Sequence, residues 1–257
     1  MKRFVAVLFL SFLCTANARA AVHTENFEYK QGETSFQGYL AYEDSSTGKK
    51  PGVLVIHEFS GLGDYAKKRA EQLAAMGNVA LAADMYGKDI KPNSHDAEIQ
   101  GELGQKDRSD TRARIVSAFE ALRTYSKVDP SRIAVIGYCT GGAAVLELAR
   151  SGADVKGFVT FHGAVNASAE EDKNIKGKIL ILHGTKDPFV PPWAVRELDN
   201  ELNGLGIPHE VRWYENAKHS FTVPSAGTDP SNGSVYDPVA DKQSWEDMTH
   251  FFDEIFK

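Results

Sequence analysis

The chain has 257 residues, of which 42% are hydrophobic, and its 35 acidic residues outnumber its 29 lysine and arginine residues, for a formal net charge of −6. This length suits one large domain or two small ones. An acidic chain without a basic cluster is a poor candidate for binding nucleic acid or an anionic membrane surface, so we expect neither partner.

Residues 1–20 are typical of a secretory signal peptide. Two basic residues precede an apolar run over 4–14, and Ala-Arg-Ala at 18–20 supplies the small residues that a signal peptidase reads. The run is shorter than the roughly 20 apolar residues that cross a bilayer. We therefore expect cleavage to leave 21–257 as a periplasmic or secreted protein without a membrane anchor.

The mature chain would contain a single cysteine, Cys139, because Cys14 lies in the signal segment. No internal disulfide could then form, although the expected compartment is oxidising. A lone thiol is a liability where oxidants are present. Its presence indicates either deep burial or a chemical purpose.

Strand and helix patterns alternate along the rest of the chain. Alternating apolar and polar residues predict two half-buried antiparallel strands at 22–30 and 34–43. Continuous apolar runs predict strands that are buried on both faces, at 53–56, 79–83, 133–136, 158–161 and 179–182. A last strand, of mixed composition, is predicted at 209–214. Helical spacing predicts helices at 64–76, 109–125, 143–150, 194–202 and 245–256, with room for a short one inside 88–107.

This alternation predicts one α/β domain over 21–257, with a mostly parallel central sheet and helices on both faces. The polar stretch 88–107 is too short for a large cap domain. Functional residues are expected in the loops after the carboxyl ends of the strands.

The segment Gly137-Tyr138-Cys139-Thr140-Gly141 follows one of these strands and precedes a helix, in the form of a G-x-S-x-G nucleophile elbow with cysteine in place of serine. A sharp strand-to-helix turn strains its tip and needs glycine two residues before and after it. The tip lies at a helix N-terminus, which favours a thiolate. The alternative is a buried core cysteine beside a glycine-rich turn.

Asp187 and His219 follow the strands at 179–182 and 209–214, in the chain order nucleophile, acid, histidine of α/β-hydrolases. His219 would accept the thiol proton and return it to the leaving group, while Asp187 would fix the histidine tautomer. Taken singly, Asp187 could cap the helix near Pro191, and His219 could be a solvated loop residue. The three residues together predict a catalytic triad.

An acyl-transfer site also needs an oxyanion hole. We assign one donor to the backbone N–H of Thr140 at the start of the helix, and the other to the N–H of Phe59, in the loop after 53–56. His57 in the same loop is given no catalytic role, since structural packing explains it equally well.

These residues resemble the dienelactone hydrolase family of α/β-hydrolases. The resemblance runs from about residue 52 to the C-terminus and rests on the motifs at 55–61, 83–87, 137–142, 183–188, 219–221 and 236–238. It implies the α/β-hydrolase fold. It also implies that Glu58 holds the resting thiol of Cys139 and is displaced when substrate binds. Without the resemblance, Glu58 could simply cap the loop before the helix near residue 64.

The sequence departs from the family pattern at two positions that concern substrate binding. The archetypal enzyme of the family binds an anionic dienelactone through two arginines, but Val223 stands at the position of one and the region of the other, 88–107, contains no arginine. Such a substrate would lose two charge-assisted contacts. The sequence therefore predicts the chemistry and leaves the natural ester open.

We expect hydrolysis of a carboxylic ester or lactone, a small-molecule substrate, through an acyl-thioester on Cys139. Neither a cofactor nor a metal is predicted, because His57, Glu58 and His95 do not form a recognised ligand set. The alternatives are an acyltransferase or a peptidase-like hydrolase on the same triad, or a non-catalytic binding protein with an inherited fold. The sequence leaves the oligomeric state open.

Overall fold

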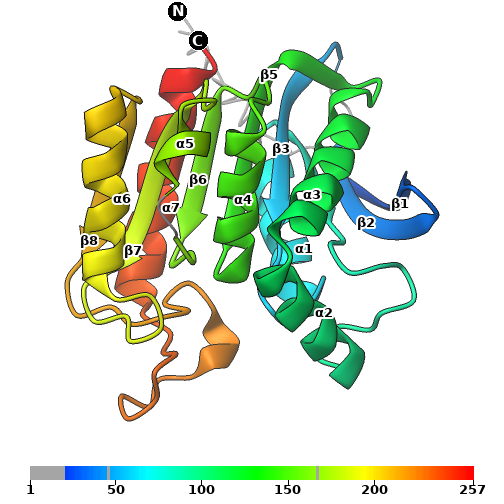
Figure 1. The fold of residues 1–257 in the computed structure, drawn as a ribbon. Helices are drawn as coiled ribbons and strands as arrows, with labels where there is room; N and C mark the ends of the chain where they lie inside the picture. The colour runs from blue at the N-terminus through cyan, green and yellow to red at the C-terminus, as the bar shows by residue number, and fades with distance from the viewer. Residues whose placement is uncertain (1–20, 45–46, 166–167) are drawn as a thin grey trace, which may run out of the picture.

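The computed structural model describes residues 21–44, 47–165 and 168–257. The expected signal segment, 1–20, lies outside the described residues, and its cleavage stays a prediction. Figure 1 shows a central sheet with helices packed against it. Among the described helices, none combines the length and the apolar character that crossing a membrane would require.

The sheet has eight strands in the order β1-β2-β4-β3-β5-β6-β7-β8. The strands are β1 (Val22–Gln31), β2 (Thr34–Glu43), β3 (Lys50–Ile56), β4 (Val79–Ala83), β5 (Val128–Tyr138), β6 (Gly157–Phe161), β7 (Lys178–Gly184) and β8 (His209–Tyr214). β1 and β2 pair antiparallel, and β2 joins β4 antiparallel. All pairings from β4 to β8 are parallel. The mostly parallel sheet predicted from the sequence is confirmed.

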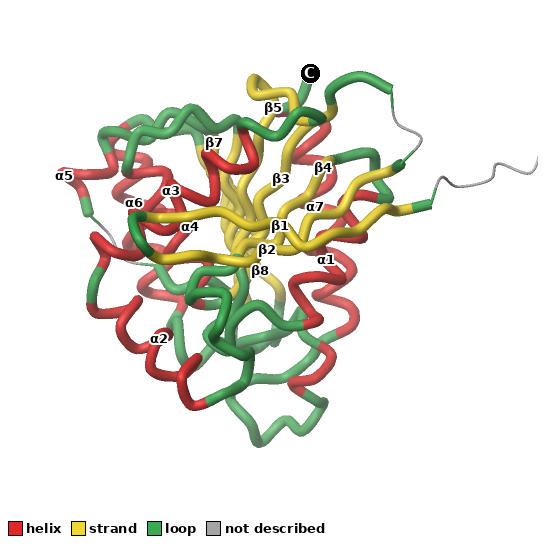
Figure 2. Tube along the Cα trace, turned by 90° about the vertical axis from the view of Figure 1, so that its right-hand side faces the viewer, coloured by secondary structure: helices red, strands yellow, loops and turns green. Residues whose placement is uncertain are grey.

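Helices cover both faces of the sheet, as Figure 2 shows edge-on. The helices are α1 (Asp64–Ala74), α2 (His95–Lys106), α3 (Arg108–Arg123), α4 (Thr140–Arg150), α5 (Ala169–Asp172), α6 (Pro192–Leu205) and α7 (Pro238–Ile255), with a 3₁₀ turn at Pro224–Ala226. α3, α4 and α6 bury side chains in the core on one face. α1 and α7 do so on the other.

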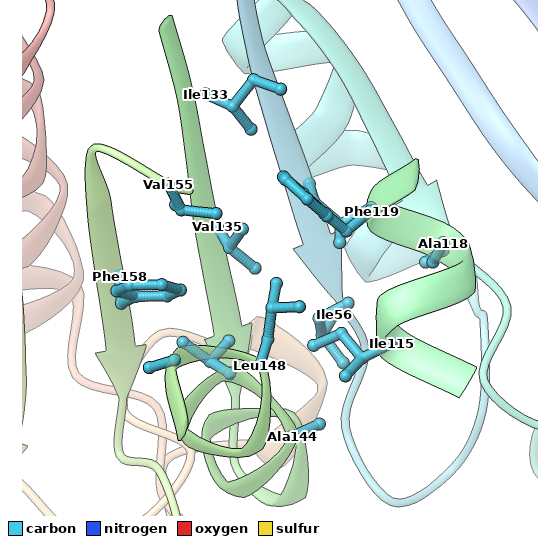
Figure 3. Close-up of a cluster of buried hydrophobic side chains, with 14 of the residues drawn as sticks. Ile56, Ile115, Ala118, Phe119, Ile133, Val135, Ala144, Leu148, Val155 and Phe158 are labelled. Carbon is cyan, nitrogen blue, oxygen red and sulfur yellow. The ribbon is translucent and has the colours of Figure 1, made fainter. Parts of the chain in front are cut away.

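The central strand β5 shows how one sequence serves both cores. Successive side chains of a strand point to opposite faces. Ile133 and Val135 therefore join the core under α3 and α4, which Figure 3 shows together with Phe119. Ala134 and Ile136 join the core under α1 and α7. A continuous apolar run is thus needed, because both faces are covered.

Capping side chains explain where two helices begin. The carboxylate of Asp107 accepts hydrogen bonds from the N–H groups of Ser109 and Asp110 at the start of α3. Asp237 does the same at the start of α7, where Pro238 takes the first helical position. The predicted start of this last helix at residue 245 was therefore wrong by seven residues, because the cap was not recognised.

The carboxyl ends of the parallel strands meet at the lower edge of the sheet in Figure 1, and the C-terminus lies at the upper edge. The loops after β3, β4, β5, β7 and β8 all leave from this lower edge. α2 stands at the same end and lies beside the loop after β3. The fold thus gathers the predicted site residues at one place.

Candidate active site

Cys139 occupies the tip of a strained turn between β5 and α4. Its backbone has φ 52° and ψ −119°, a conformation that residues other than glycine rarely adopt. A Cβ on Gly137 would lie 2.3 Å from the carbonyl oxygen of Gly141, and one on Gly141 would lie 2.7 Å from those of Ile56 and His57. Both flanking glycines are therefore required sterically, Gly137 by the turn itself, as inferred from the sequence, and Gly141 by the carbonyls at the end of β3.

His219 bridges the thiol and a carboxylate. Its Nε2 lies 3.0 Å from Sγ of Cys139, and its Nδ1 lies 2.8 Å from Oδ2 of Asp187. The Asp187 side chain is fully buried, and His219 is nearly so. The structure thus brings together three residues that are up to 80 positions apart in the chain.

The second carboxylate oxygen of Asp187 is also occupied. Oδ1 accepts hydrogen bonds from the N–H groups of Phe189 and Val190, each at 2.9 Å. These bonds fix the carboxylate plane, so that the other oxygen faces the imidazole. The alternative role for Asp187, a cap on the helix near Pro191, is wrong, since α6 begins at Pro192 without a side-chain cap.

The surroundings of His219 favour its charged form. Burial lowers its pKa, but the hydrogen bonds and charges of Asp187 and Cys139 act in the opposite direction and prevail. The pKa of His219 is raised to about 10. The imidazole is therefore protonated at neutral pH.

The two amides assigned to an oxyanion hole have free N–H groups. No oxygen within the described ranges accepts a hydrogen bond from the N–H of Phe59 or of Thr140. The close approach of Gly141 to the carbonyls of Ile56 and His57 brings the start of α4 against the loop that holds Phe59. The N–H of Thr140 is thus free directly after Cys139, and the loop that holds Phe59 lies against the same turn.

The residue Phe59 is held from two sides. The hydroxyl of Tyr86, after β4, donates to the carbonyl oxygen of Phe59 at 2.8 Å. The Phe59 ring packs under α2, where a Cβ on Gly101 would lie 2.5 Å from the ring. Neither contact follows from the sequence motif, because each joins segments that are far apart in the chain.

Glu58 faces the site from the loop after β3. Its Oε1 accepts a long hydrogen bond of 3.5 Å from the hydroxyl of Ser220. Burial raises the pKa of Glu58, while the charge of His219 and the Ser220 hydroxyl lower it in part. Glu58 does not cap α1, because Gly63 is the N-cap of that helix and no side chain caps it.

His57 is structural. Its Nδ1 donates to the carbonyl oxygen of Glu58 at 2.6 Å, and its Nε2 accepts from the N–H of Met85 at 3.1 Å. Both bonds are satisfied by one neutral tautomer. Burial also lowers the pKa of His57. This imidazole ties the loop after β3 to the loop after β4, which agrees with giving it no catalytic role.

Three residues near the site were missed by sequence reasoning. His162 directly follows β6 and packs against the His219 ring, with centroids 5.1 Å apart. The exposed ring of Phe189 contacts the same imidazole, with centroids 5.2 Å apart. Arg114 of α3 lines a cleft that begins at Thr140 and Gly141. His162 and Phe189 follow strand ends and could have been suspected, whereas Arg114 carries no sequence signal.

The cleft lies beside the start of α4. Apolar side chains form much of its wall, among them Ile56, Met85 and Ala144. The side formed by α2 and α3 is polar and includes Gln100, Asp110 and Arg114. Figure 3 shows Ile56 and Ala144 among the buried side chains of the core. The cleft thus runs from Thr140, whose N–H is one of the two assigned oxyanion donors, to a charged pair on α3.

The sheet and the strand–cysteine–helix elbow define an α/β-hydrolase. A family model for the dienelactone hydrolase family matches residues 36–256, and the chain belongs to this family.

Similar proteins cover nearly the whole chain. A Synechocystis protein named as a candidate carboxymethylenebutenolidase is 28% identical over 236 residues, covering 86% of this chain and 92% of its own. A crystal structure of a dienelactone hydrolase-like promiscuous phosphotriesterase from metagenomic libraries is 36% identical, with a TM-score of 0.87 over 93% of this chain and 100% of that one. The dienelactone hydrolase from Anabaena variabilis, at 18% identity and a TM-score of 0.67, covers 92% of this chain and 99% of its own and shares the fold.

Proposed function

We propose that the protein hydrolyses a carboxylic ester or lactone through an acyl-thioester on Cys139. The observation that carries this proposal is the arrangement of His219, with Nε2 at 3.0 Å from Sγ and Nδ1 at 2.8 Å from Asp187. This is the geometry of a nucleophile, a base and an orienting acid. Membership of the dienelactone hydrolase family supports the same reaction class.

In the first step, the Cys139 thiolate attacks the acyl carbon, and the carbonyl electron pair moves onto oxygen. Collapse of this tetrahedral intermediate breaks the bond to the alcohol oxygen, which takes the proton from His219. In the second step, neutral His219 removes a proton from water, and hydroxide attacks the thioester. The acid leaves, and the thiolate and protonated histidine are restored.

The N–H groups of Phe59 and Thr140 would stabilise the oxyanion in both steps. They have no acceptor among the described residues, so they need not break another bond when the charge develops. A donor of this kind typically contributes about 3 kcal/mol to transition-state stabilisation. The proposal therefore assigns catalysis to backbone groups as well as to side chains.

Glu58 would hold the thiol of Cys139 in the resting enzyme and, when substrate enters, release it to His219, whose Nε2 lies 3.0 Å from Sγ in the structure. Its raised pKa and its long bond to Ser220 support a carboxyl group that can exchange partners. Replacing Glu58 with Ala should raise the rate of Cys139 alkylation by iodoacetamide without substrate and lower ester turnover. If both rates match those of the wild type, Glu58 does not hold the thiol.

The first test compares p-nitrophenyl acetate and a dienelactone as substrates of the mature protein, beside Cys139→Ala. We expect the variant to lose activity by roughly 10⁴-fold or more. Trapping a thioester on Cys139 by rapid acid quench and mass spectrometry would identify the intermediate. Equal rates for wild type and variant would remove Cys139 from the reaction and overturn the proposal.

A phosphotriester is a second candidate substrate, because a solved neighbour with 36% identity is described as a promiscuous phosphotriesterase. Here the thiolate would attack phosphorus and expel an aryl oxide, and water would then release the phosphodiester. Diethyl p-nitrophenyl phosphate tests this activity. Release of p-nitrophenol by the wild type but not by Cys139→Ala would support it, and equal rates would reject it.

We also propose that the protein is exported and acts in a periplasm or outside the cell. The basic start, the apolar run and the small residues at 18–20 support this location. Expression of the full chain in a bacterial host, followed by cell fractionation and N-terminal sequencing, tests it. A product retained in the cytoplasm with residues 1–20 attached would contradict the proposal.

A further inference from the structure

The cleft beside the start of α4 lies on the β3 and β4 side of Cys139, opposite the side from which His219 approaches. His219 approaches Cys139 from the loop after β8. The strand order places β8 on one side of β5, and β3 and β4 on the other. Residues after β3 and β4, together with α2 and α3, form most of the cleft, so it opens away from His219.

This position assigns the cleft to the acyl part of a substrate. The alcohol oxygen must lie near Nε2 of His219 to receive its proton, so the alcohol part occupies the β8 side. The acyl substituent then points the other way, past the N–H of Thr140. This step rests on the proposed ester hydrolysis, which defines the two sides.

Arg114 is the cation in the cleft wall, and its position is fixed. Its Nη1 donates to the carbonyl oxygen of Met85 at 2.8 Å and to Oε1 of Gln100 at 3.0 Å. Its guanidinium also lies over the ring of Phe36, 5.9 Å from the ring centroid. The group is anchored by contacts that do not depend on a substrate.

The charge of Arg114 is compensated within the cleft. Its Nε lies 2.7 Å from Oδ2 of Asp110 without the geometry of a hydrogen bond, so the attraction is Coulombic. The Arg114 side chain is largely shielded from solvent, at 18% exposure, whereas that of Asp110 is partly exposed, at 37%. An incoming carboxylate would gain the attraction of Arg114 and meet the repulsion of Asp110 at the same place.

We propose that this cleft binds the acyl group of the substrate and that the Asp110–Arg114 pair makes it select an uncharged acyl group. The apolar side chains of Ile56, Met85 and Ala144 would contact the chain of such a group. Asp110 is then a specificity-determining residue, because it cancels the charge that would otherwise attract a carboxylate.

The test uses two ligands of the same shape and different charge, p-nitrophenyl 5-methylhexanoate and the p-nitrophenyl monoester of glutaric acid. Their dissociation constants are measured on Cys139→Ala, which prevents turnover. We expect the uncharged ester to bind at least about tenfold more tightly. Adding Asp110→Asn should move the ratio of the two constants by about tenfold towards the glutarate ester.

Two further variants identify the cause. Glu120→Gln removes an exposed carboxylate from the same helix, where it pairs with Arg123, and should leave the ratio unchanged. Adding Arg114→Gln to Asp110→Asn should return the ratio towards its original value, because the gain requires the arginine. Equal ratios in the Asp110 and Glu120 variants, or equal binding of both esters before either change, would overturn the proposal.

Turnover of the uncharged ester by the wild type is measured separately. An absence of turnover together with the expected shift in binding would reject ester hydrolysis while leaving the ligand selection in place. Turnover together with an unchanged binding ratio would reject the selection and leave hydrolysis in place. The two failures are therefore distinguishable.

Discussion

The imidazole of His162 lies edge-to-face against that of His219, with ring centroids 5.1 Å apart and planes inclined by 65°. Nε2 of His162 lies 2.9 Å from the hydroxyl of Thr222. Burial lowers the pKa of His162 well below its ordinary value, and the charge of His219 lowers it further. A ring that stays neutral thus supports one that carries a charge.

Replacing His162 with Phe keeps a ring beside His219, whereas Ala leaves a gap through which the imidazole can shift. We expect kcat of the Ala variant to be about tenfold or more below that of the Phe variant, because small displacements of catalytic groups are costly. Steady-state kinetics of both variants, with circular dichroism to confirm folding, makes the comparison. Equal kcat values would show that the ring does not position His219.

The pH dependence of the reaction should report the ionisation of His219. For an alkyl ester, whose leaving group needs a proton, kcat/KM should fall as the pH rises through the pKa of His219, near 10. Asp187→Asn removes a contact that raises this pKa, so the alkaline limb should move to lower pH. The rate should also fall by on the order of 10³- to 10⁴-fold.

The chain offers a matched control for this change. Asp199 contacts Nε2 of His209 at 2.9 Å, outside the site, so Asp199→Asn breaks an aspartate–histidine pair without touching Cys139. Its activity and its alkaline limb should equal those of the wild type. If Asp187→Asn does not shift the alkaline limb of the kcat/KM profile, a group other than His219 controls the loss of activity at high pH.

Replacing either of two glycines with alanine should have opposite effects on the stability of the fold. A Cβ at Gly141 would lie 2.7 Å from two carbonyl oxygens, so Gly141→Ala should destabilise by roughly 1–3 kcal/mol and impair catalysis. Gly204 in α6 has open space at this position, and Gly204→Ala should stabilise by about 0.4–1 kcal/mol. Urea denaturation curves measure both, and equal midpoints would contradict the steric account.

A buried ion pair joins α4 to α5. The side chains of Arg150 and Asp172 are both fully buried, with Nε at 2.5 Å from Oδ1. Asp172→Asn leaves a buried arginine without this carboxylate and should cost about 3 kcal/mol. Glu170→Gln, on the same helix and 88% exposed, should cost less than about 0.5 kcal/mol. Thermal unfolding of both variants tests this, and equal losses would contradict it.

Local patterns were enough to predict the fold. The apolar runs at 53–56 and 133–136 lie inside β3 and β5, because strands buried on both faces need continuous apolar residues. The loops that carry Asp187 and His219 followed from the same reasoning, and the structure brings both residues to Cys139. Their catalytic roles stay predictions.

Contacts between distant segments could not be predicted. Arg114 lies on an ordinary helical face, and only the packing of α3 against the loop after β4 turns it towards the cleft. His162 becomes relevant only through the fold, which brings the end of β6 beside the loop after β8. The absence of arginine at 88–107 and at 223 therefore describes only part of the charge pattern around the cleft, because Arg114 also lines it.

The carboxylate of Asp187 is held through both of its oxygens, and this limits how the loop between β7 and α6 can vary in sequence. One carboxylate oxygen is held by the main-chain N–H groups of residues 189 and 190, which every residue except proline possesses. The hydrogen bonds that fix this oxygen therefore do not depend on the side chains at 188–190, provided that neither amide is lost, although the ring of Phe189 also contacts His219. Inserting or deleting one residue would move both amides and turn the carboxylate away, so length constrains this loop more than composition does.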